Sequence, residues 1–311
     1  MPLGSSTVSP ANTAAAPKAP FGRLTTAMIT PFRPDGSLDL DAAQKVAGYL
    51  VDRGNDALVI NGTTGEAPTT SDQEKVQLVK AVLEAVGDRA KVIAGVGTND
   101  TAHTIECAKQ AEAAGADGLL VVTPYYNKPP QEGLRVHFTA VADATGLPNM
   151  LYDIPGRAGV PIKTETLIAL AEHPRIVAVK DAKGDIAGTT KVLANTDLFY
   201  YCGADELNLA TLAIGAVGIA SVVAHVASPE YRQLIDAVVA GDLATAQEID
   251  RRLVPAVEAI MTRTQGAIMV KAALKLAGVI EHATLRSPLV EATAGQVDWL
   301  TTDLKTAGLI A

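Results

Sequence analysis

Short apolar runs alternate with longer amphipathic segments along the chain from Leu24 onward. The short runs are rich in Val, Ile and Ala, as expected of strands buried on both faces, and the longer segments have the hydrophobic period of a helix. This alternation is typical of βα units that form a parallel sheet. Strands are predicted at residues 25–30, 57–61, 91–96, 118–123, 149–153, 176–181, 199–202 and 218–222.

The spacing of these eight strands predicts a closed barrel. Roughly 20 to 35 residues separate successive strands, which leaves room for one helix in each unit of a (β/α)8, or TIM, barrel. The alternative is a doubly wound open sheet, which usually carries a G-x-G-x-x-G turn after its first strand. Residues 31–36 read PFRPDG instead, so the α/β fold that we predict is the barrel.

The two ends of the chain differ from this βα pattern. Residues 1–20 are rich in Ala, Pro, Ser and Thr, and the segment after the eighth strand is long enough for several amphipathic helices. We therefore expect a disordered tail over residues 1–20, the barrel over residues 21–227, and a C-terminal helical region over residues 228–311 that packs on the barrel.

The composition limits the classes of partner. The net charge of -8 argues against nucleic acid, because polyanion-binding surfaces are usually basic. Residues 1–20 lack the apolar run of a signal peptide, and no apolar stretch reaches the roughly 18 to 20 residues that cross a bilayer. Cys107 and Cys202 show no C-x-x-C motif and no Cys/His ligand spacing, which fits a reducing compartment. We expect a soluble, cytoplasmic protein that acts on small molecules.

Polar residues follow four of the predicted strands at the end where a barrel holds its chemistry. These groups are Asn61 to Glu66 after strand 2, Thr123 to Asn127 after strand 4, Tyr152 and Asp153 on strand 5, and Lys180 and Asp181 on strand 6. Because the carboxyl ends of the strands meet on one face, we expect a site there.

Lys180 is the most unusual of these residues, because it ends the apolar run 176–179. One interpretation is a structural lysine that extends outward and pairs with Asp181. The other is a nucleophile, whose pKa must fall by about three units from about 10.4, at a cost of about 4 kcal/mol. Desolvation at the mouth of a barrel lowers the pKa in that direction.

The neighbouring residues each have a functional and a structural interpretation. Thr63 and Thr64 lie between two glycines, where backbone amides could bind a carboxylate or form an ordinary tight turn. Tyr152 could transfer protons or fill the core. Arg157 follows strand 5 in a Pro-Gly-Arg loop, where it could bind a substrate carboxylate or form a surface salt bridge.

We expect no metal and no bound cofactor. The five histidines lie in separate βα units, without paired acids and without an i,i+4 spacing among them. P-loop and flavin motifs are absent from the sequence. The electrophile must then come from the substrate and Lys180 together.

Four motifs resemble the dihydrodipicolinate synthase family within the N-acetylneuraminate lyase superfamily. They are GTTGE at 62–66, VTPYYNKP at 122–129, LYDIPGR at 151–157 and VKDA at 179–182, and the resemblance covers nearly all of residues 21–311. It implies the condensation of pyruvate with L-aspartate 4-semialdehyde to 4-hydroxy-tetrahydrodipicolinate, on the route to diaminopimelate and lysine.

The resemblance also implies roles for individual residues. Lys180 would form an imine with pyruvate, and Thr63 and Thr64 would hold the carboxylate of that pyruvate. Tyr152 would pass protons through Thr64 to Tyr126, which in this family enters the site from a neighbouring subunit. A homo-oligomer follows, and the family is commonly a tetramer built as a dimer of dimers.

The second substrate is less firmly implied than pyruvate. Arg157 would bind the carboxylate of the semialdehyde, and the backbone carbonyl of Ala220 would lie near the lysine. Cys202, Ala204 and Ala220 depart from the family pattern. A sibling enzyme of the N-acetylneuraminate lyase or keto-sugar-acid aldolase type is therefore an alternative, and a non-catalytic barrel that binds pyruvate is a second one.

Feedback inhibition by lysine is expected to be weak or absent. In family members that lysine inhibits, histidines and a glutamate bind the effector, and the corresponding positions here are Asp72, Lys75 and His103. The ammonium of Lys75 would repel the ammonium of the effector. His103 stands where inhibited members have the glutamate, so the effector loses an anionic partner.

Overall fold

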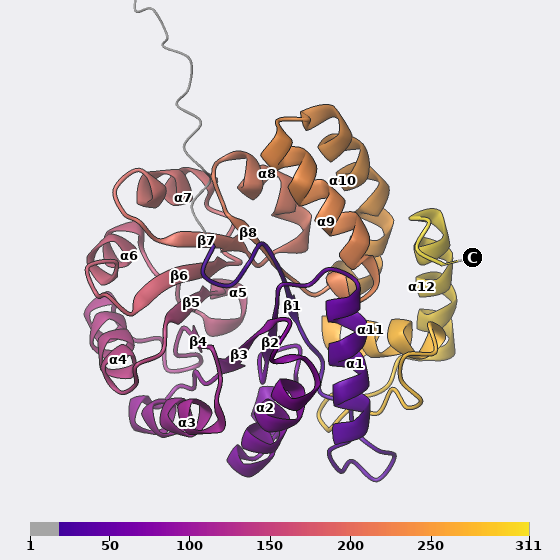
Figure 1. The fold of residues 1–311 in the computed structure, drawn as a ribbon, viewed down its shortest axis with the longest axis horizontal. Coiled ribbons are helices and arrows are strands. Elements are labelled where there is room, and N and C mark those ends of the chain that lie inside the picture. The colour runs from indigo at the N-terminus through magenta and orange to yellow at the C-terminus, as the bar shows by residue number, and fades with distance from the viewer. Residues whose placement is uncertain (1–18, 311) are drawn as a thin grey trace, which may run out of the picture.

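The structure, a computed structural model, describes residues 19–310, and its centre is a closed parallel barrel (Figure 1). The strands pair in sequence order, and β1 pairs with β8 to close the ring. Their bounds are β1 Leu24–Ala27, β2 Ala57–Ile60, β3 Lys91–Gly95, β4 Gly118–Val122, β5 Asn149–Asp153, β6 Ile176–Asp181, β7 Phe199–Cys202 and β8 Gly218–Ser221. The predicted TIM barrel is confirmed.

The largest error in the predicted strand bounds is at β1, which ends at Ala27 rather than at residue 30. Beyond Ala27 one more backbone bond reaches β2, from the amide of Met28 to the carbonyl of Val59 at 2.8 Å, and the ladder then ends. The amide of Ile29 donates to Nε2 of His225 at 3.1 Å, and the hydroxyl of Thr30 donates to the carbonyl of Gly65 at 2.7 Å. This departure brings the end of β1 against the loop after β2.

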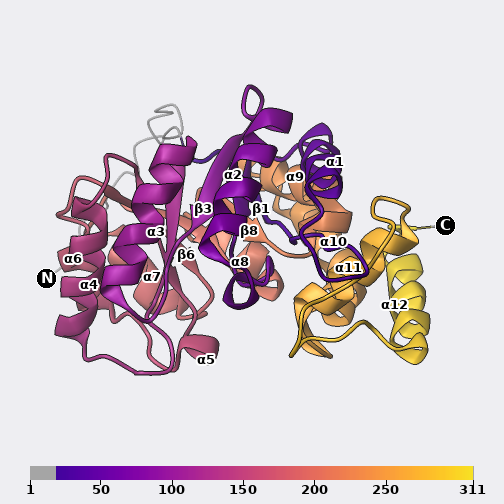
Figure 2. The ribbon, with the colours of Figure 1, turned by 90° about the horizontal axis from the view of Figure 1, so that it is seen from below.

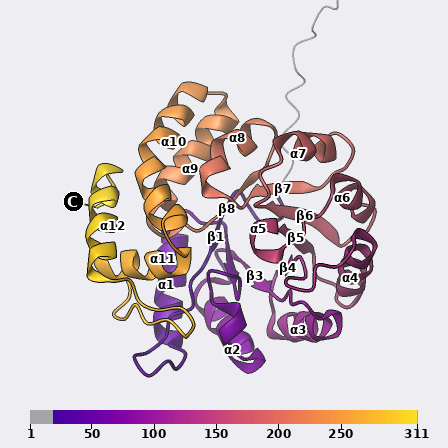
Figure 3. The same cartoon turned by 180° about the vertical axis from the view of Figure 1, so that it is seen from behind.

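Helices surround the barrel, as Figures 1 and 3 show from opposite sides. The ring consists of α1 Leu40–Asp52, α2 Asp72–Val86, α3 Thr101–Ala114, α4 Gln131–Asp143, α6 Thr164–Leu170, α7 Ile186–Leu193, α8 Asn208–Ala213 and α9 Ala224–Ala240. Helix α2 begins with a capping box, in which Ser71 and Glu74 bond to each other's backbone amides. The short helix α5, Pro155–Ala158, lies in the loop after β5, in front of the strands in Figure 3.

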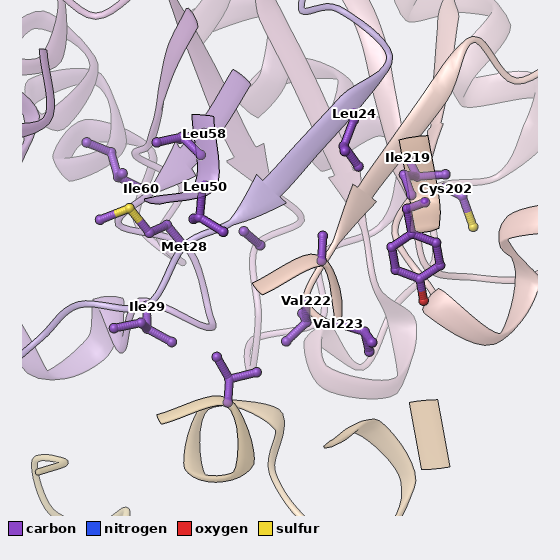
Figure 4. Packing of buried hydrophobic residues seen from close by; sticks show 14 of the residues in the cluster. Leu24, Met28, Ile29, Leu50, Leu58, Ile60, Cys202, Ile219, Val222 and Val223 are labelled. Carbon is purple, nitrogen blue, oxygen red and sulfur yellow. The ribbon is translucent and has the colours of Figure 1, made fainter. Parts of the chain in front are cut away.

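Two apolar cores lie on the two sides of the barrel wall. The outer core fills the space between strands and helices, and Figure 4 shows part of it around Leu58, Ile60 and Ile219. The inner core includes Tyr152, Ala178 and Tyr201. Because side chains alternate along a strand, Lys180 points inward with Ala178, two residues earlier.

Phe21 fills the end of the barrel where the strands begin. It is 1% exposed, and its ring packs near that of Tyr201, with the centroids 6.3 Å apart. The amide of Phe21 also donates to the hydroxyl of Tyr201 at 3.1 Å. A Cβ added to Gly118, the first residue of β4, would lie 2.5 Å from the Phe21 ring. This packing closes one end and leaves the carboxyl ends of the strands for the site.

The C-terminal helices lie together at one side of the barrel (Figure 2). They are α10 Leu243–Val257, a π-helical turn at Glu258–Thr262, α11 Gly266–Leu276 and α12 Ala294–Thr306. The expected division between residues 227 and 228 falls inside α9, at Ala227, where the backbone leaves helical geometry with φ −123° and ψ 25°. Of the expected tail, residues 1–18 lie outside the described residues. Between residues 19 and 310, no helix is both long and apolar enough to span a bilayer.

Candidate active site

Lys180 and Tyr152 lie side by side on neighbouring strands inside the barrel. Their Cα atoms are register partners between β5 and β6, and the Lys180 Nζ atom lies 4.6 Å from the centre of the Tyr152 ring. The two residues are 3% and 6% exposed. Burial lowers the pKa of Lys180 to about 8, although the negative charge of Asp205 opposes this shift.

The structure disfavours the structural interpretation of Lys180. Asp181 points away from it, and its carboxylate accepts hydrogen bonds from the Thr189 hydroxyl and the Lys183 amide, both at 2.7 Å. Within residues 19–310, no carboxylate forms a salt bridge with Lys180. A buried amine without an ion-pair partner is the arrangement that a nucleophilic lysine requires.

The phenol of Tyr152 is held in its protonated form. Burial raises its pKa to about 12, and the positive charge of Arg157 and a hydrogen bond with the Thr63 side chain oppose that shift. The predicted partner on the relay was Thr64, whereas the side chain that reaches the phenol is that of Thr63. Thr64 itself is 7% exposed and lies in the same loop.

The loop that carries Thr63 and Thr64 has a constrained backbone. Asn61 and Glu66 flank it, and both have left-handed φ angles, of 57° and 55°. At Gly65 a Cβ would lie 3.1 Å from the Thr30 hydroxyl and 3.2 Å from the carbonyl of Met28, so a side chain there would crowd the chain just after β1. The loop is thereby fixed against the end of β1.

A buried ion pair ties this loop to the C-terminal region. Glu66 accepts from Lys271 Nζ on α11 and, at 2.9 Å, from the amide of Arg286. Burial lowers the pKa of Lys271, and the Glu66 charge opposes that change. The charged ends of Lys271 and Arg286 lie 4.4 Å and 4.3 Å from the centre of the Phe32 ring. This pair was not predicted from the sequence, although Lys271 is a lone charge within the apolar run 267–274.

Asp205 is a second residue that sequence analysis did not assign to the site. Its carboxylate, 3% exposed, accepts hydrogen bonds from the Ser221 hydroxyl and from the amides of Val222 and Val223 at 2.9 Å and 3.1 Å. It therefore holds the chain just after β8, which carries Ala220 in the inner core. Its charge also faces Lys180 closely enough to raise the pKa of the amine.

The departures at Cys202 and Ala204 belong to one local contact. Cys202 packs in the outer core, and its thiol donates to the carbonyl of Ala204 at 3.1 Å. These residues turn the chain from β7 toward Asp205.

Arg157 stands at the mouth of the barrel in α5. Its side chain is exposed, and among the described residues no carboxylate pairs with it. Below it, Asp153 is 1% exposed and lies 3.2 Å from the Lys183 ammonium. Burial raises the pKa of Asp153 to about 6, against the effect of Lys183. The guanidinium is therefore open to a ligand, above a buried ion pair that supports the loop.

Tyr126 does not join the buried group. Its side chain is 88% exposed, and its backbone has a left-handed φ of 74°. The structure thus brings Lys180, Tyr152 and Thr63 together and leaves Tyr126 on the surface.

Comparison with known proteins gives consistent results. The family model of the dihydrodipicolinate synthetase family (DHDPS) matches residues 20–307. A 4-hydroxy-tetrahydrodipicolinate synthase of Kineococcus radiotolerans is 63% identical over 96% of this chain and 97% of that protein, and 4-hydroxy-tetrahydrodipicolinate synthase 2 of Streptomyces coelicolor is 60% identical over 94% and 97%. A crystal structure of DHDPS from Cyanidioschyzon merolae with lysine bound is 39% identical, covers 94% of this chain and 100% of that one, and superposes with a TM-score of 0.91.

Proposed function

The chain belongs to the dihydrodipicolinate synthetase family, and from this premise we propose that it condenses pyruvate with L-aspartate 4-semialdehyde to 4-hydroxy-tetrahydrodipicolinate through an imine on Lys180. The observation that carries the proposal is the buried amine of Lys180. With a pKa of about 8, roughly a tenth of it is unprotonated at pH 7, against about one part in a thousand for an ordinary lysine.

The catalytic cycle requires no bound cofactor. The Lys180 amine attacks the keto carbon of pyruvate, and loss of water gives the imine. Removal of a proton from the methyl carbon gives the enamine, and this carbon attacks the aldehyde carbon of the semialdehyde. The amino group of the semialdehyde then displaces Lys180 from the imine carbon, which closes the ring and frees the enzyme.

The other site residues bind the substrates and move protons. The backbone amides of Thr63 and Thr64, with the Thr64 hydroxyl, hold the pyruvate carboxylate in the loop fixed by Gly65 and Glu66. Tyr152 stays protonated and donates to the oxygen that leaves as water, with Thr63 within its reach. Arg157, open at the mouth, holds the carboxylate of the semialdehyde, and the carbonyl of Ala220 faces the reacting nitrogen.

Tyr126 completes the proton path of a second subunit in an oligomer, for which we propose a tetramer built as a dimer of dimers. Its exposed side chain supports this role, because it can reach only groups outside its own barrel core. Co-expression of Lys180→Ala and Tyr126→Ala chains tests it. A mixed dimer has one site that keeps Lys180 and receives an intact Tyr126, so activity should return. If Tyr126 serves its own chain, every site lacks one group and activity stays absent.

Reductive trapping tests the imine. The protein is incubated with pyruvate and borohydride, and peptide mapping should place one reduced pyruvate adduct on Lys180. Lys180→Ala should abolish the adduct, whereas the control Lys191→Ala, at an exposed lysine paired with Glu165, should keep it. An adduct that persists in Lys180→Ala would disprove the mechanism.

A panel of candidate substrates then separates the proposed enzyme from its siblings. Turnover with aspartate semialdehyde, and none with N-acetylneuraminate, is expected. The reverse pattern, with trapping retained, would move the chain to the sibling class. Trapping with no turnover of any aldehyde would favour the non-catalytic barrel.

A further inference from the structure

Three side chains that bind metals in other proteins converge between α2 and α3, outside the barrel wall. Asp72 is the first residue of α2, and His103 and Cys107 lie four residues apart on one face of α3. One ligand atom from each lies within 4.8 Å of the other two. The sequence led us to expect no Cys/His ligand spacing at Cys107, whereas His103 lies four residues before it on the same helix, with its ligand atom near that of Cys107.

The distances fit one ion with little rearrangement. His103 Nε2 lies 2.8 Å from Asp72 Oδ2, and the Cys107 thiol lies 3.7 Å from Asp72 Oδ1. Ligand atoms on a tetrahedral zinc ion lie roughly 3 to 4 Å apart, given bonds of about 2.0 to 2.3 Å. The exposed His103 side chain can rotate to close the remaining gap to Cys107.

A small cavity with an unpaired polar atom adjoins the cluster. Asp72 and Cys107 line it together with Asn61 and Gln110, and its free volume is about 10 Å³, close to the space that one water needs. Asn61 is 3% exposed, and its side-chain oxygen has no hydrogen-bond partner. A buried carbonyl oxygen of this kind calls for a ligand or a water that a ligand can hold.

We propose that Asp72, His103 and Cys107 bind one divalent cation of the zinc class, with a water that bonds to the Asn61 side chain as the fourth ligand. Carboxylate, imidazole and thiolate together are the ligand set of borderline-soft ions rather than of Mg²⁺ or Ca²⁺. Binding releases the proton of the Cys107 thiol to solvent, because the thiolate is the ligand.

This site is separate from the catalytic one. Ala94 and Val96 line the cavity and belong to the outer core, whereas Lys180 faces the interior of the barrel. The cation would join α2 to α3. It would lie behind the Thr63–Thr64 loop, because Asn61 flanks that loop and its side-chain nitrogen donates to the carbonyl of Lys75 on α2 at 3.1 Å.

Lys75 opposes binding and provides a test of the geometry. Its ammonium lies 3.5 Å from Asp72 Oδ1 and donates to the carbonyl of Thr70 at 2.7 Å. A cation on Asp72 would feel this positive charge. Lys75→Met should therefore strengthen binding several-fold.

Titration with Co²⁺ tests the proposal on the full-length chain, without a histidine tag and with its cysteines reduced. We expect one equivalent per chain and a thiolate-to-cobalt charge-transfer band. Cys107→Ser should remove that band, and His103→Ala should weaken binding at least about tenfold. The matched control Cys202→Ser, at the other buried cysteine, should leave the band unchanged.

Three outcomes would overturn the site: no thiolate band in the wild type, a band that survives Cys107→Ser, or a band lost in Cys202→Ser. Circular dichroism checks that each variant is folded. If Cys107→Ser does not fold, His103→Ala decides, because His103 is 44% exposed and its replacement leaves the core intact. None of these measurements depends on turnover.

Discussion

Glu66, in the loop that carries the two site threonines, is ion-paired inside the protein with Lys271 of the C-terminal helix α11. Their side chains are 1% and 0% exposed, and the charged atoms lie 2.5 Å apart. The geometry of the loop that carries Thr63 and Thr64 thus depends on a helix that lies outside the βα repeat. Removing one partner leaves a buried charge without compensation.

Replacement of Lys271 by Met should lower the free energy of unfolding by about 3 to 5 kcal/mol, the usual cost of breaking a buried pair. Urea denaturation measures the change. The control Lys191→Met breaks an exposed pair with Glu165 and should cost about 1 kcal/mol or less. A loss for Lys271→Met no larger than that of the control would show that Glu66 is not held by this contact.

The rate of pyruvate imine formation should rise with pH up to about 8 and then level off. The free amine is the nucleophile, and the pKa of Lys180 is lowered to about 8, so each pH unit below 8 costs about tenfold in rate. Borohydride quench at short times gives the rate. Asp205→Asn should move the midpoint to lower pH, because it removes a charge that raises this pKa. An exposed control, Asp197→Asn, should not move it.

Lys180→Met should make the folded protein more stable at pH 7. A lysine whose pKa falls from 10.5 to about 8 on folding binds more protons when unfolded. It therefore weakens the folded state by roughly 3 kcal/mol below pH 8, and this penalty disappears as the pH rises from 8 to 10.5. Urea denaturation at pH 7 and at pH 10 should show a larger gain for Lys180→Met at the lower pH. Equal gains at both pH values would contradict the lowered pKa.

L-Lysine should inhibit the enzyme weakly or not at all. The Asp72 carboxylate is already engaged by His103 at 2.8 Å and by Lys75 at 3.5 Å, and Lys75 adds a positive charge that repels the effector. Initial rates over a range of lysine concentrations measure this, and half-maximal inhibition below millimolar lysine would refute it. The variant with Asp72→His, Lys75→His and His103→Glu removes the repelling ammonium and adds a carboxylate for the effector, so it should become sensitive.

The fold was predictable because each βα unit carries its own local signal. Strands of four to six residues between longer amphipathic helices can be recognised one by one, and their number and spacing predict the barrel. The end of β1 was not predictable, because the partners of the residues that follow it are distant in sequence. The Ile29 amide donates to His225, 196 residues away, and the Thr30 hydroxyl donates to Gly65, 35 residues away. No local sequence pattern indicates hydrogen-bond partners at such a distance.

The same distinction separates the parts of the site. Lys180 and Tyr152 could be placed together because both end neighbouring strands of a predictable sheet. Lys271 lies 205 residues from Glu66, and the part that Asp205 plays beyond β8 depends on contacts 16 to 18 residues away in another unit. Pairings of this kind follow from how the units pack: the apolar run 267–274 marks Lys271 as a buried charge but does not identify its partner.

Phe21 has a practical consequence for handling the protein. Because it plugs the end of the barrel where the strands begin, the chain enters at the face opposite the substrate mouth. A tag or surface linker attached ahead of residue 19 joins the fold on that rear face. Attachment at that end keeps the linker away from the carboxyl ends of the strands, where Lys180 and Arg157 lie.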